Sequence, residues 1–267
     1  MSSSRSPVKR LSADIPDERE TLRRLFQIKR TELQMLNTRG YDLSEVVMEI
    51  NDNPVKVDLR FMLDDSLGLT DEFTDDLPYF SYMLEYRNST GLFASRKDFS
   101  AVYPEGLVVL YLLSKPGKAV SAAEFQVVSK YIQLANTSGV FKRFILISKN
   151  GLSVDNRSKI SDRYSSYPFE HFYDHELGFN RLNHALAPIS IKHIPSADVA
   201  EWGREEEVQP EKMPMIISQD IVSRWYGASA MDVFQTEIVG STTDTEGYAR
   251  IVRMTSADDT KLAPKYK

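Results

Sequence analysis

The chain has 267 residues, of which 42% are hydrophobic, and carries a formal net charge of -5. This composition supports one large domain or two smaller ones. It contains no cysteine, which excludes disulfides, thiolate zinc sites and cysteine nucleophiles. The longest strongly apolar run, residues 107–113, is far shorter than the roughly 20 residues that a membrane helix needs. We expect a soluble, intracellular protein with no membrane partner, and the acidic balance argues against a free-standing nucleic-acid binder.

The N-terminal part begins with a stretch rich in Ser, Arg and Lys, residues 1–15, which we expect to be a disordered arm. A helix signal follows. Asp17 is placed to cap a helix, Glu20 stands three residues further on as in a capping box, and Gly40 supplies a left-handed stop. The pattern predicts one long helix between these signals.

The next segment is acidic. Residues 42–86 hold twelve Asp and Glu residues and only two basic ones, and Pro54, Gly68 and Pro78 interrupt the segment. No paired general acid and base stands out from so many carboxylates, and a solvated surface with short strands explains the pattern better.

The clearest pattern in the chain is a β-α-β unit. Residues 107–113 are typical of a buried strand, and Ser121 with Glu124 forms a capping box at the start of a helix that ends at Gly139. Residues 141–148 are typical of a second strand, and a loop over residues 149–156 follows. We therefore predict a mixed α/β (α+β) fold with parallel strands covered by a helix.

A basic segment starts at the end of this unit. Residues 142–163 contain six Lys and Arg residues against Asp155 and Asp162. Such a segment is able to contact nucleic-acid phosphates without reading the base sequence. The alternative is a mixed surface that balances the acidic segment, and the sequence favours neither.

Catalytic and metal-binding patterns are weak. His171 and His175 are four residues apart, but Phe172 stands where zinc hydrolases carry Glu, so structural roles are favoured for these histidines and for His184 and His193. A nuclease-like sheet needs an acid and a Glu-x-Lys on neighbouring strands around magnesium, and residues 144–147 are apolar throughout. We expect no active site, no metal, no cofactor and no small-molecule substrate.

The C-terminal part contains a compact helix-strand unit. Residues 201–214 are charged and contain Gly and Pro, which is typical of a surface loop. Asp220 is placed to cap a short helix that Gly227 ends, and strands over residues 232–239 and 248–254 follow. The tail from residue 256 is polar.

Four segments resemble the small subunit shared by eukaryotic RNA polymerases I, II and III, whose archaeal counterpart is the H polypeptide of the archaeal RNA polymerase. "MPMIISQDIVSRWYG" (213–227) is similar to the C-terminal signature of that family, and "DTEGYARIVR" (244–253) to its closing turn and strand. "NHALAPISIKHI" (183–194) resembles the entry to the C-terminal domain. The opening helix of the family, which ends in Arg-Gly-Tyr, is similar to residues 18–41.

The chain also departs from this family. The Asp-Pro of the helix start is Asp220-Ile221, and the basic Lys-Arg-Gly after the helix is Ser229-Ala230-Met231. The turn before Asp244 and the segment near Ile189 each contain three extra residues. These changes indicate a diverged member: a paralogue specific to one polymerase class, or a viral homologue.

The resemblance implies a non-catalytic polymerase subunit with a jaw domain over residues 16–178 and an assembly domain over 181–255, followed by a tail over 256–267. In the family, the jaw resembles restriction nucleases without their active site and lies along downstream duplex DNA, and the assembly domain docks on the largest subunit. The resemblance implies a nucleus or nucleolus, or a viral factory in the cytoplasm.

By position, two groups of residues are expected to carry these contacts. The DNA-proximal group, which would hold duplex weakly and without specificity, is Lys149, Arg157 and Lys159. The subunit-interface group is Arg224, Trp225, Tyr226 and Arg253, with one of the two aromatics expected in the core. The alternatives are a transcription or chromatin adaptor with the same docking module, and a nuclease-like DNA-processing protein.

Overall fold

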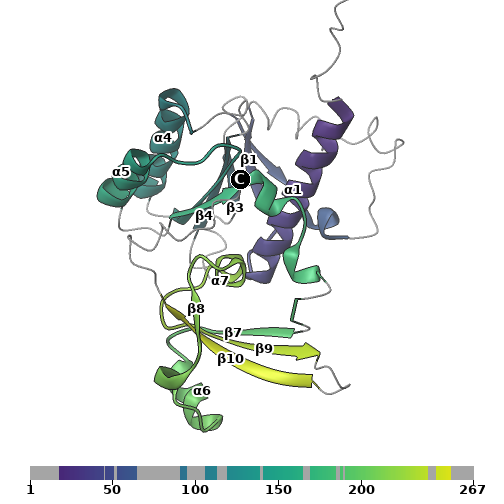
Figure 1. Cartoon of the computed structure of the whole chain (residues 1–267). Coiled ribbons are helices and arrows are strands. Elements are labelled where there is room, and N and C mark those ends of the chain that lie inside the picture. The colour runs from purple at the N-terminus through teal and green to yellow at the C-terminus, as the bar shows by residue number, and fades with distance from the viewer. Residues whose placement is uncertain are drawn as a thin grey trace, which may run out of the picture. The chain divides into compact units, whose positions relative to one another are not determined.

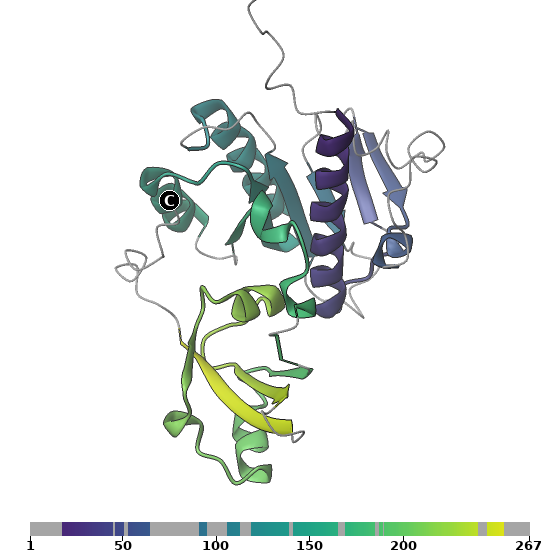
Figure 2. The same cartoon turned by 45° about the vertical axis from the view of Figure 1, so that its right-hand side comes forward.

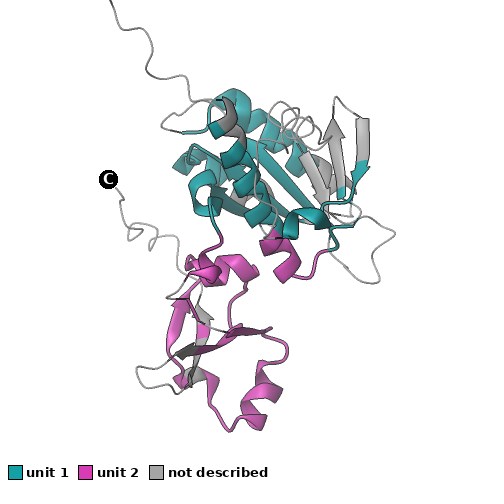
Figure 3. Cartoon of the chain, turned by 90° about the vertical axis from the view of Figure 1, so that its right-hand side faces the viewer, with its two compact units in different colours: residues 1–33, 42–179 teal, residues 34–41, 180–267 magenta. Residues whose placement is uncertain are grey.

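The computed structural model of the 267-residue chain divides into two compact units (Figure 3). Unit 1 comprises residues 1–33 and 42–179, and unit 2 comprises residues 34–41 and 180–267. The structure describes residues 18–44, 46–50, 53–64, 91–94, 106–112, 119–138, 141–164, 169–184, 187–188, 190–239 and 245–253.

Unit 1 is built on a six-stranded mixed sheet of order β2-β1-β3-β4-β5-β6 (Figure 1). The strands are β1 (Val46–Ile50), β2 (Asn53–Val57), β3 (Gly91–Ala94), β4 (Gly106–Leu112), β5 (Phe141–Ser148) and β6 (Phe169–Tyr173). The β4-β5 and β5-β6 pairs are parallel and the other pairs are antiparallel. The predicted mixed α/β fold is confirmed.

The predicted β-α-β unit is β4, α4 (Ala122–Ser138) and β5. The capping box at its start is present: the Ser121 N–H donates to Glu124 Oε2 at 2.7 Å, and the Glu124 N–H donates to Ser121 Oγ at 3.3 Å. Helix α4 packs Val128 and Ile132 on the sheet face that carries Leu110 and other apolar residues of β4 and β5.

Helix α5 (Val154–Tyr164) lies beside α4 (Figure 1) and corrects the loop expected over residues 149–156. Its start is capped, because the Asn156 N–H donates to Ser153 Oγ at 3.1 Å. The helix is strongly polar, and Ile160 joins the core beneath α4. The helix was not predicted because only a narrow apolar stripe marks it in the sequence.

The other face of the unit 1 sheet is covered by α1 (Glu18–Thr38), the long helix that the capping signals predict (Figure 2). Tyr111 of β4 contacts Glu32 of this helix, whereas Leu110 faces α4, as strand alternation requires. The Tyr111 hydroxyl donates to Glu32 Oε2 at 2.6 Å, and Lys29 Nζ donates to the same oxygen. All three side chains are buried, and burial, partly offset by Glu32, lowers the pKa of Lys29.

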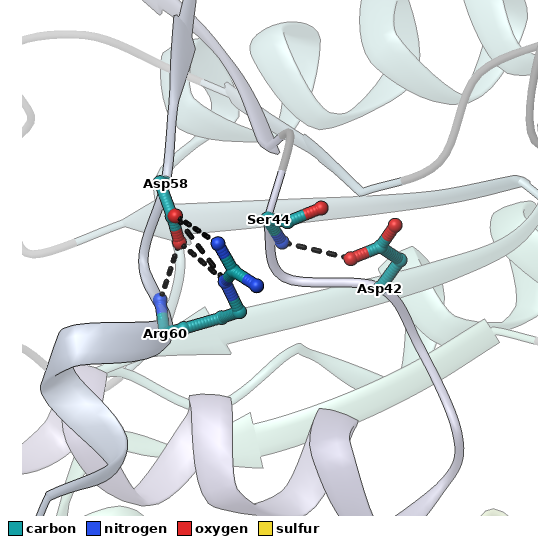
Figure 4. A network of polar contacts seen from close by, with 4 residues as sticks. All are labelled: Asp42, Ser44, Asp58 and Arg60. Carbon is teal, nitrogen blue, oxygen red and sulfur yellow. Dashed lines mark hydrogen bonds and ion pairs between the residues drawn. The ribbon is translucent and has the colours of Figure 1, made fainter.

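Part of the acidic segment is visible around the β1-β2 hairpin (Figure 4). Arg60 Nη2 lies 2.6 Å from Asp58 Oδ2, and the Ser44 N–H donates to Asp42 Oδ1 at 2.9 Å. Hydrogen bonds from the Arg60 side chain and backbone lower the pKa of Asp58. These carboxylates stabilise local turns on an exposed surface, and residues 65–86 lie outside the described residues.

Unit 2 is a four-stranded sheet of order β7-β9-β10-β8, in which the β8-β10 pair is parallel. Its elements are β7 (Ser190–Ile194), α6 (Val199–Glu205), β8 (Met215–Ile217), α7 (Ile221–Tyr226), β9 (Val233–Val239) and β10 (Thr245–Arg253). Val233 packs with α6 and its neighbour Phe234 packs with α7, so the two helices cover opposite faces of the sheet. The surface loop expected over residues 201–214 is therefore partly wrong, because Trp202 fastens α6 to the core.

Four short 3₁₀ helices complete the described elements. They are η1 (Arg60–Leu63), η3 (Asp174–Leu177), η4 (Arg181–Asn183) and η5 (Pro210–Lys212). Within the described ranges, every helix is too short or too polar to span a lipid bilayer.

Candidate functional site

Helix α7 has the start and end that its sequence predicts. The Val222 N–H donates to Asp220 Oδ1 at 2.9 Å, which satisfies one of the unpaired donors of the first turn. Gly227 adopts the left-handed conformation with φ 62°, and its N–H donates a hydrogen bond to Arg224 O. Two local signals thus hold a helix of only six residues.

A third contact on α7 comes from the other end of the chain. Arg39 Nε donates to Trp225 O at 2.8 Å, and Arg39 Nη2 donates to Arg224 O. The last carbonyls of a helix lack intrahelical partners and favour a cation, so a guanidinium is well suited to this place. Gly40, with φ 83°, ends α1 directly after this residue.

This contact gives a physical role to the Arg-Gly-Tyr sequence at residues 39–41. Sequence analysis missed that role, although a basic residue next to a helix stop was a usable signal. Asn180 Nδ2 also donates to Gln34 Oε1 at 3.1 Å. Residues 34–41 therefore belong to unit 2, although they precede all of the unit 1 strands in sequence.

An aromatic cluster lies between α7 and the sheet of unit 2. The ring of Phe234 lies 5.4 Å from that of Tyr226 and 5.1 Å from that of His193, and the Tyr226 and His193 rings are 5.7 Å apart. The Tyr226 hydroxyl donates to Ile191 O at 3.4 Å, and burial raises the pKa of Tyr226. The cluster attaches α7 to strands β7 and β9.

A buried carboxylate closes the turn next to this cluster. His193 Nε2 lies 2.8 Å from Asp232 Oδ2, the Ser229 N–H donates to Oδ2 at 2.8 Å, and the Ser196 N–H donates to Oδ1 at 2.8 Å. Burial alone would raise the pKa of Asp232, but these hydrogen bonds outweigh it and the pKa is lowered. His193 thus contacts both this carboxylate and the aromatic cluster.

The four expected interface residues occupy different environments. Trp225 is only 2% exposed and is the core member of the aromatic pair, whereas Arg224 and Tyr226 are half-buried. Arg253 ends β10 in register with Ile217, and its side chain lies outside the described residues.

Strand β8 adds two exposed apolar side chains that sequence analysis missed. Met215 is 56% exposed and Ile217 is 53% exposed, while Ile216 between them is buried. The alternation in "MII" was the available signal. Two exposed apolar side chains on an edge strand form a small surface that is suited to binding another protein.

In unit 1, Lys149, Arg157 and Lys159 are all exposed. Lys149 follows β5 directly, while the other two lie on α5, about 200° apart around the helix axis. Lys159 Nζ is paired with Asp155 Oδ2 at 2.6 Å. Among the described residues no ion pair is seen for Lys149 or Arg157. Arg157 and Lys159 therefore lie on different sides of α5.

The two histidines that are four residues apart in unit 1 lie on different elements. His171 lies on strand β6 and His175 on η3, so helical spacing does not apply. Ser148 Oγ lies 2.8 Å from His171 Nε2, and the Ser148 hydroxyl also donates to Asn150 O at 2.6 Å. In the described part of the chain, no group of three or more potential metal-ligating side chains is found.

The fold defines a mixed α/β protein of two units. No family model matches the chain. Over 211 residues it is 24% identical to the "DNA-directed RNA polymerases I, II, and III subunit RPABC1" of Caenorhabditis briggsae and 23% identical to that of Caenorhabditis elegans. Each alignment covers 79% of this chain and 86% of the relative. The chain is thus distantly similar to a shared subunit of RNA polymerases.

Among solved structures, the chain has a TM-score of 0.31 and 11% identity to the crystal structure of a protein of unknown function, AF1548. The match covers 70% of this chain and 81% of that one. This likeness is too low to define a common fold.

Proposed function

We infer that this chain is a non-catalytic subunit of a multi-subunit DNA-dependent RNA polymerase, a diverged counterpart of the subunit shared by polymerases I, II and III and of the archaeal H polypeptide. The observation that carries the proposal is the extent of the similarity. Unit 1 has 171 residues (33 in 1–33 and 138 in 42–179), so an alignment of 211 residues includes part of both units.

The C-terminal unit is proposed to dock on the largest subunit. Arg224 and Tyr226 present half-buried anchors on α7, and Met215 and Ile217 present apolar side chains on β8. Aromatic and Arg residues with apolar neighbours are typical of the energetic centre of an interface. The Trp225 side chain is buried within unit 2, so we propose that it stabilises α7 and does not contact a partner directly. Arg253 remains part of the proposed interface through its position beside β8.

The N-terminal unit is proposed to be the jaw that lies near downstream duplex DNA. Lys149 and Arg157 are exposed and have no ion pair in the described residues, as is also true of Lys130 on α4, whereas Asp155 neutralises part of the charge of Lys159. Contacts of this kind are weak, insensitive to base sequence and weakened by salt. With this function we propose a nuclear location.

Affinity purification of the tagged full-length chain from its own cells tests the proposal. We expect the two largest polymerase subunits in stoichiometric amounts, measured by quantitative mass spectrometry. Met215→Ser combined with Tyr226→Ala should release the chain from them, while Lys149→Glu should leave their recovery unchanged. Substoichiometric recovery would favour a transcription or chromatin adaptor instead, and magnesium-dependent DNA cleavage by the purified chain would favour a nuclease.

A further inference from the structure

Unit 2 contains an open cavity next to α6, which we name the α6 cavity. Its volume is about 430 Å³, within the range of protein sites that take up small groups. Its main lining residues are Val199, Gly203, Arg204, Val208, Pro210 and Met231. Neither α7 nor β8 contributes to the lining, so the cavity is separate from the surface proposed above for docking on the largest subunit.

One wall is a loop that folds back on α6. The Val208 N–H donates to Gly203 O at 2.9 Å. A Cβ atom at Gly203 would lie 3.0 Å from Val208 O and 3.4 Å from the Pro210 ring, so glycine permits this close approach. The loop turns at Glu207, which has φ 55°. Val208 is left 37% exposed at the edge of the cavity.

Met231 also lines the cavity, and its backbone has φ 71° although it is not glycine. This conformation costs free energy for any residue with a side chain. Glu207 and Met231 are the non-glycine residues with positive φ in the part of the chain that the structure describes. The hydrogen bonds from Ser196 and Ser229 to Asp232 hold the turn in place. The Met231 side chain is 48% exposed, so it gains little from burial within its own unit.

The surroundings of the cavity are strongly acidic. Within residues 198–210 the exposed acidic residues are Asp198, Glu201, Glu205, Glu206 and Glu207, and the one basic residue is Arg204. Five carboxylates against one guanidinium give this stretch a net charge of -4. Helical spacing places Glu201 and Glu205 one residue beyond the lining positions of α6, so they flank the apolar surface rather than fill it.

We propose that the α6 cavity binds one aliphatic or methionine side chain from a Lys- and Arg-rich segment of a partner protein. The apolar lining residues take the anchor side chain, and the carboxylates next to the lining positions in sequence outnumber Arg204, so they attract the flanking cations. This excess of negative charge discriminates against neutral and acidic segments. The inference does not rest on the polymerase proposal, because it uses only residues of the cavity and the carboxylates next to them in sequence.

The test uses the full-length chain and a panel of fluorescein-labelled nine-residue peptides. Each peptide has a central Leu, Ile or Met with Lys and Arg on both sides. In matched peptides Ser replaces the anchor, or Glu replaces the basic residues. Fluorescence anisotropy at 50 and 200 mM salt should show saturable binding that weakens with salt, and at least tenfold weaker binding of both matched peptides. Equal binding of the Ser and Leu peptides would overturn the proposal, as would an absence of saturable binding across the panel.

Variants of the chain distinguish peptide binding in the α6 cavity from non-specific binding to exposed apolar residues. Met231→Gly keeps the backbone conformation favourable and removes one wall, so we expect about tenfold weaker peptide binding, the effect of losing one buried side chain. Glu205→Lys combined with Glu206→Lys should abolish the salt dependence of the peptide affinity. Val154→Ser is the matched control, because Val154 is an exposed apolar residue of unit 1 that neither lines the cavity nor belongs to the proposed docking surface. Equal effects of Met231→Gly and Val154→Ser would contradict the proposal.

A competition measurement and a sedimentation measurement test two other occupants of the cavity. A synthetic peptide of residues 3–12 of this chain that displaces the probe with higher affinity would assign the cavity to its own arm. Sedimentation of the chain as a dimer that Met231→Gly dissociates would assign it to a second copy. Either result would overturn the partner-segment proposal while leaving the co-purification test of the polymerase proposal unaffected.

Discussion

The two units each bury a carboxylate in contact with a basic side chain, but they satisfy it differently. In unit 1 the Lys29–Glu32–Tyr111 network places two donors on Glu32 Oε2, and Glu32 Oε1 is buried without a hydrogen-bond partner in the described residues. In unit 2 both oxygens of Asp232 accept hydrogen bonds, two of them from backbone N–H groups.

The difference shows what a buried charge does in each place. The Lys29–Glu32–Tyr111 network links one helix to one strand, where apolar residues of the same volume would serve as well or better. Asp232 holds a turn whose backbone N–H groups need an acceptor, and apolar residues cannot supply one. The Lys29–Glu32–Tyr111 network carries a desolvation cost that apolar residues would avoid, whereas Asp232 is part of the local backbone structure.

The largest expected effect comes from breaking the network of unit 1. Lys29→Ala leaves the Glu32 carboxylate buried without its cation, and we expect the free energy of unfolding to fall by about 3 to 5 kcal/mol. Urea unfolding followed by circular dichroism measures this change. Lys29→Met with Glu32→Leu and Tyr111→Phe is the control, which should recover most of the loss. A triple variant as unstable as Lys29→Ala would show that the network is needed.

The corresponding change in unit 2 is Asp232→Asn. Loss of the charged acceptor should lower the free energy of unfolding by about 1.5 to 3 kcal/mol at neutral pH. Because the pKa of Asp232 is lowered in the folded chain, its contribution is complete above the ordinary value of 3.8 and is lost as the pH falls through the folded value. The difference in free energy of unfolding between the original protein and Asp232→Asn should therefore shrink below about pH 4. A difference that persists below this pH would show that the ionised carboxylate of Asp232 is not what stabilises the turn.

A smaller effect is expected from Arg39→Ala, which uncovers the last carbonyls of α7. We expect a loss of about 1 to 2 kcal/mol, concentrated in unit 2. Hydrogen exchange of the Gly227 and Ala228 amides should become faster, while the amides of β4 and β5 stay protected. Arg39→Lys keeps the charge but loses the planar guanidinium that donates to two carbonyls at once. Its free energy of unfolding should lie between those of the original protein and of Arg39→Ala. Uniformly faster exchange in both units would argue against a local cap.

The smallest expected effect has the opposite sign. Met231→Gly relieves the strain at φ 71° but gives the unfolded chain more freedom, so the net gain should be about 0.5 to 1 kcal/mol. Thermal unfolding should show a slightly higher Tm. Met231→Ala keeps the strain and is the matched control. A Tm that falls in Met231→Gly would show that the Met231 side chain itself stabilises the turn.

The parts of the fold that were predictable carry strong local signals. The apolar run of β4, the capping box at Ser121 and the Asp220 and Gly227 signals of α7 each lie within a few residues of the structure that they specify. Helix α5 was missed because Ile160 alone provides little periodicity. The start of α6 was hidden by the charges that follow it.

The candidate site was less predictable, because its contacts are distant in sequence or depend on backbone angles. Arg39 and Trp225 are 186 positions apart, and no local pattern connects them. The α6 cavity depends on the positive φ of Met231 and on the fold-back at Gly203, and the sequence suggested only that the Lys-Arg-Gly of the related family is replaced at residues 229–231. Arg224, Trp225 and Tyr226 lie on the helix that the sequence predicts, but the sequence did not show that Trp225 is buried while the other two are half-buried.

The assignment of residues 34–41 to unit 2 has a consequence for how the protein is made. These residues leave the ribosome early, whereas the carbonyls that Arg39 caps are synthesised about 185 residues later. At about 5 to 20 residues per second this is a wait of roughly 10 to 40 s. During translation the second unit is therefore completed around a segment that already exists, and a fragment that begins at residue 180 would lack it.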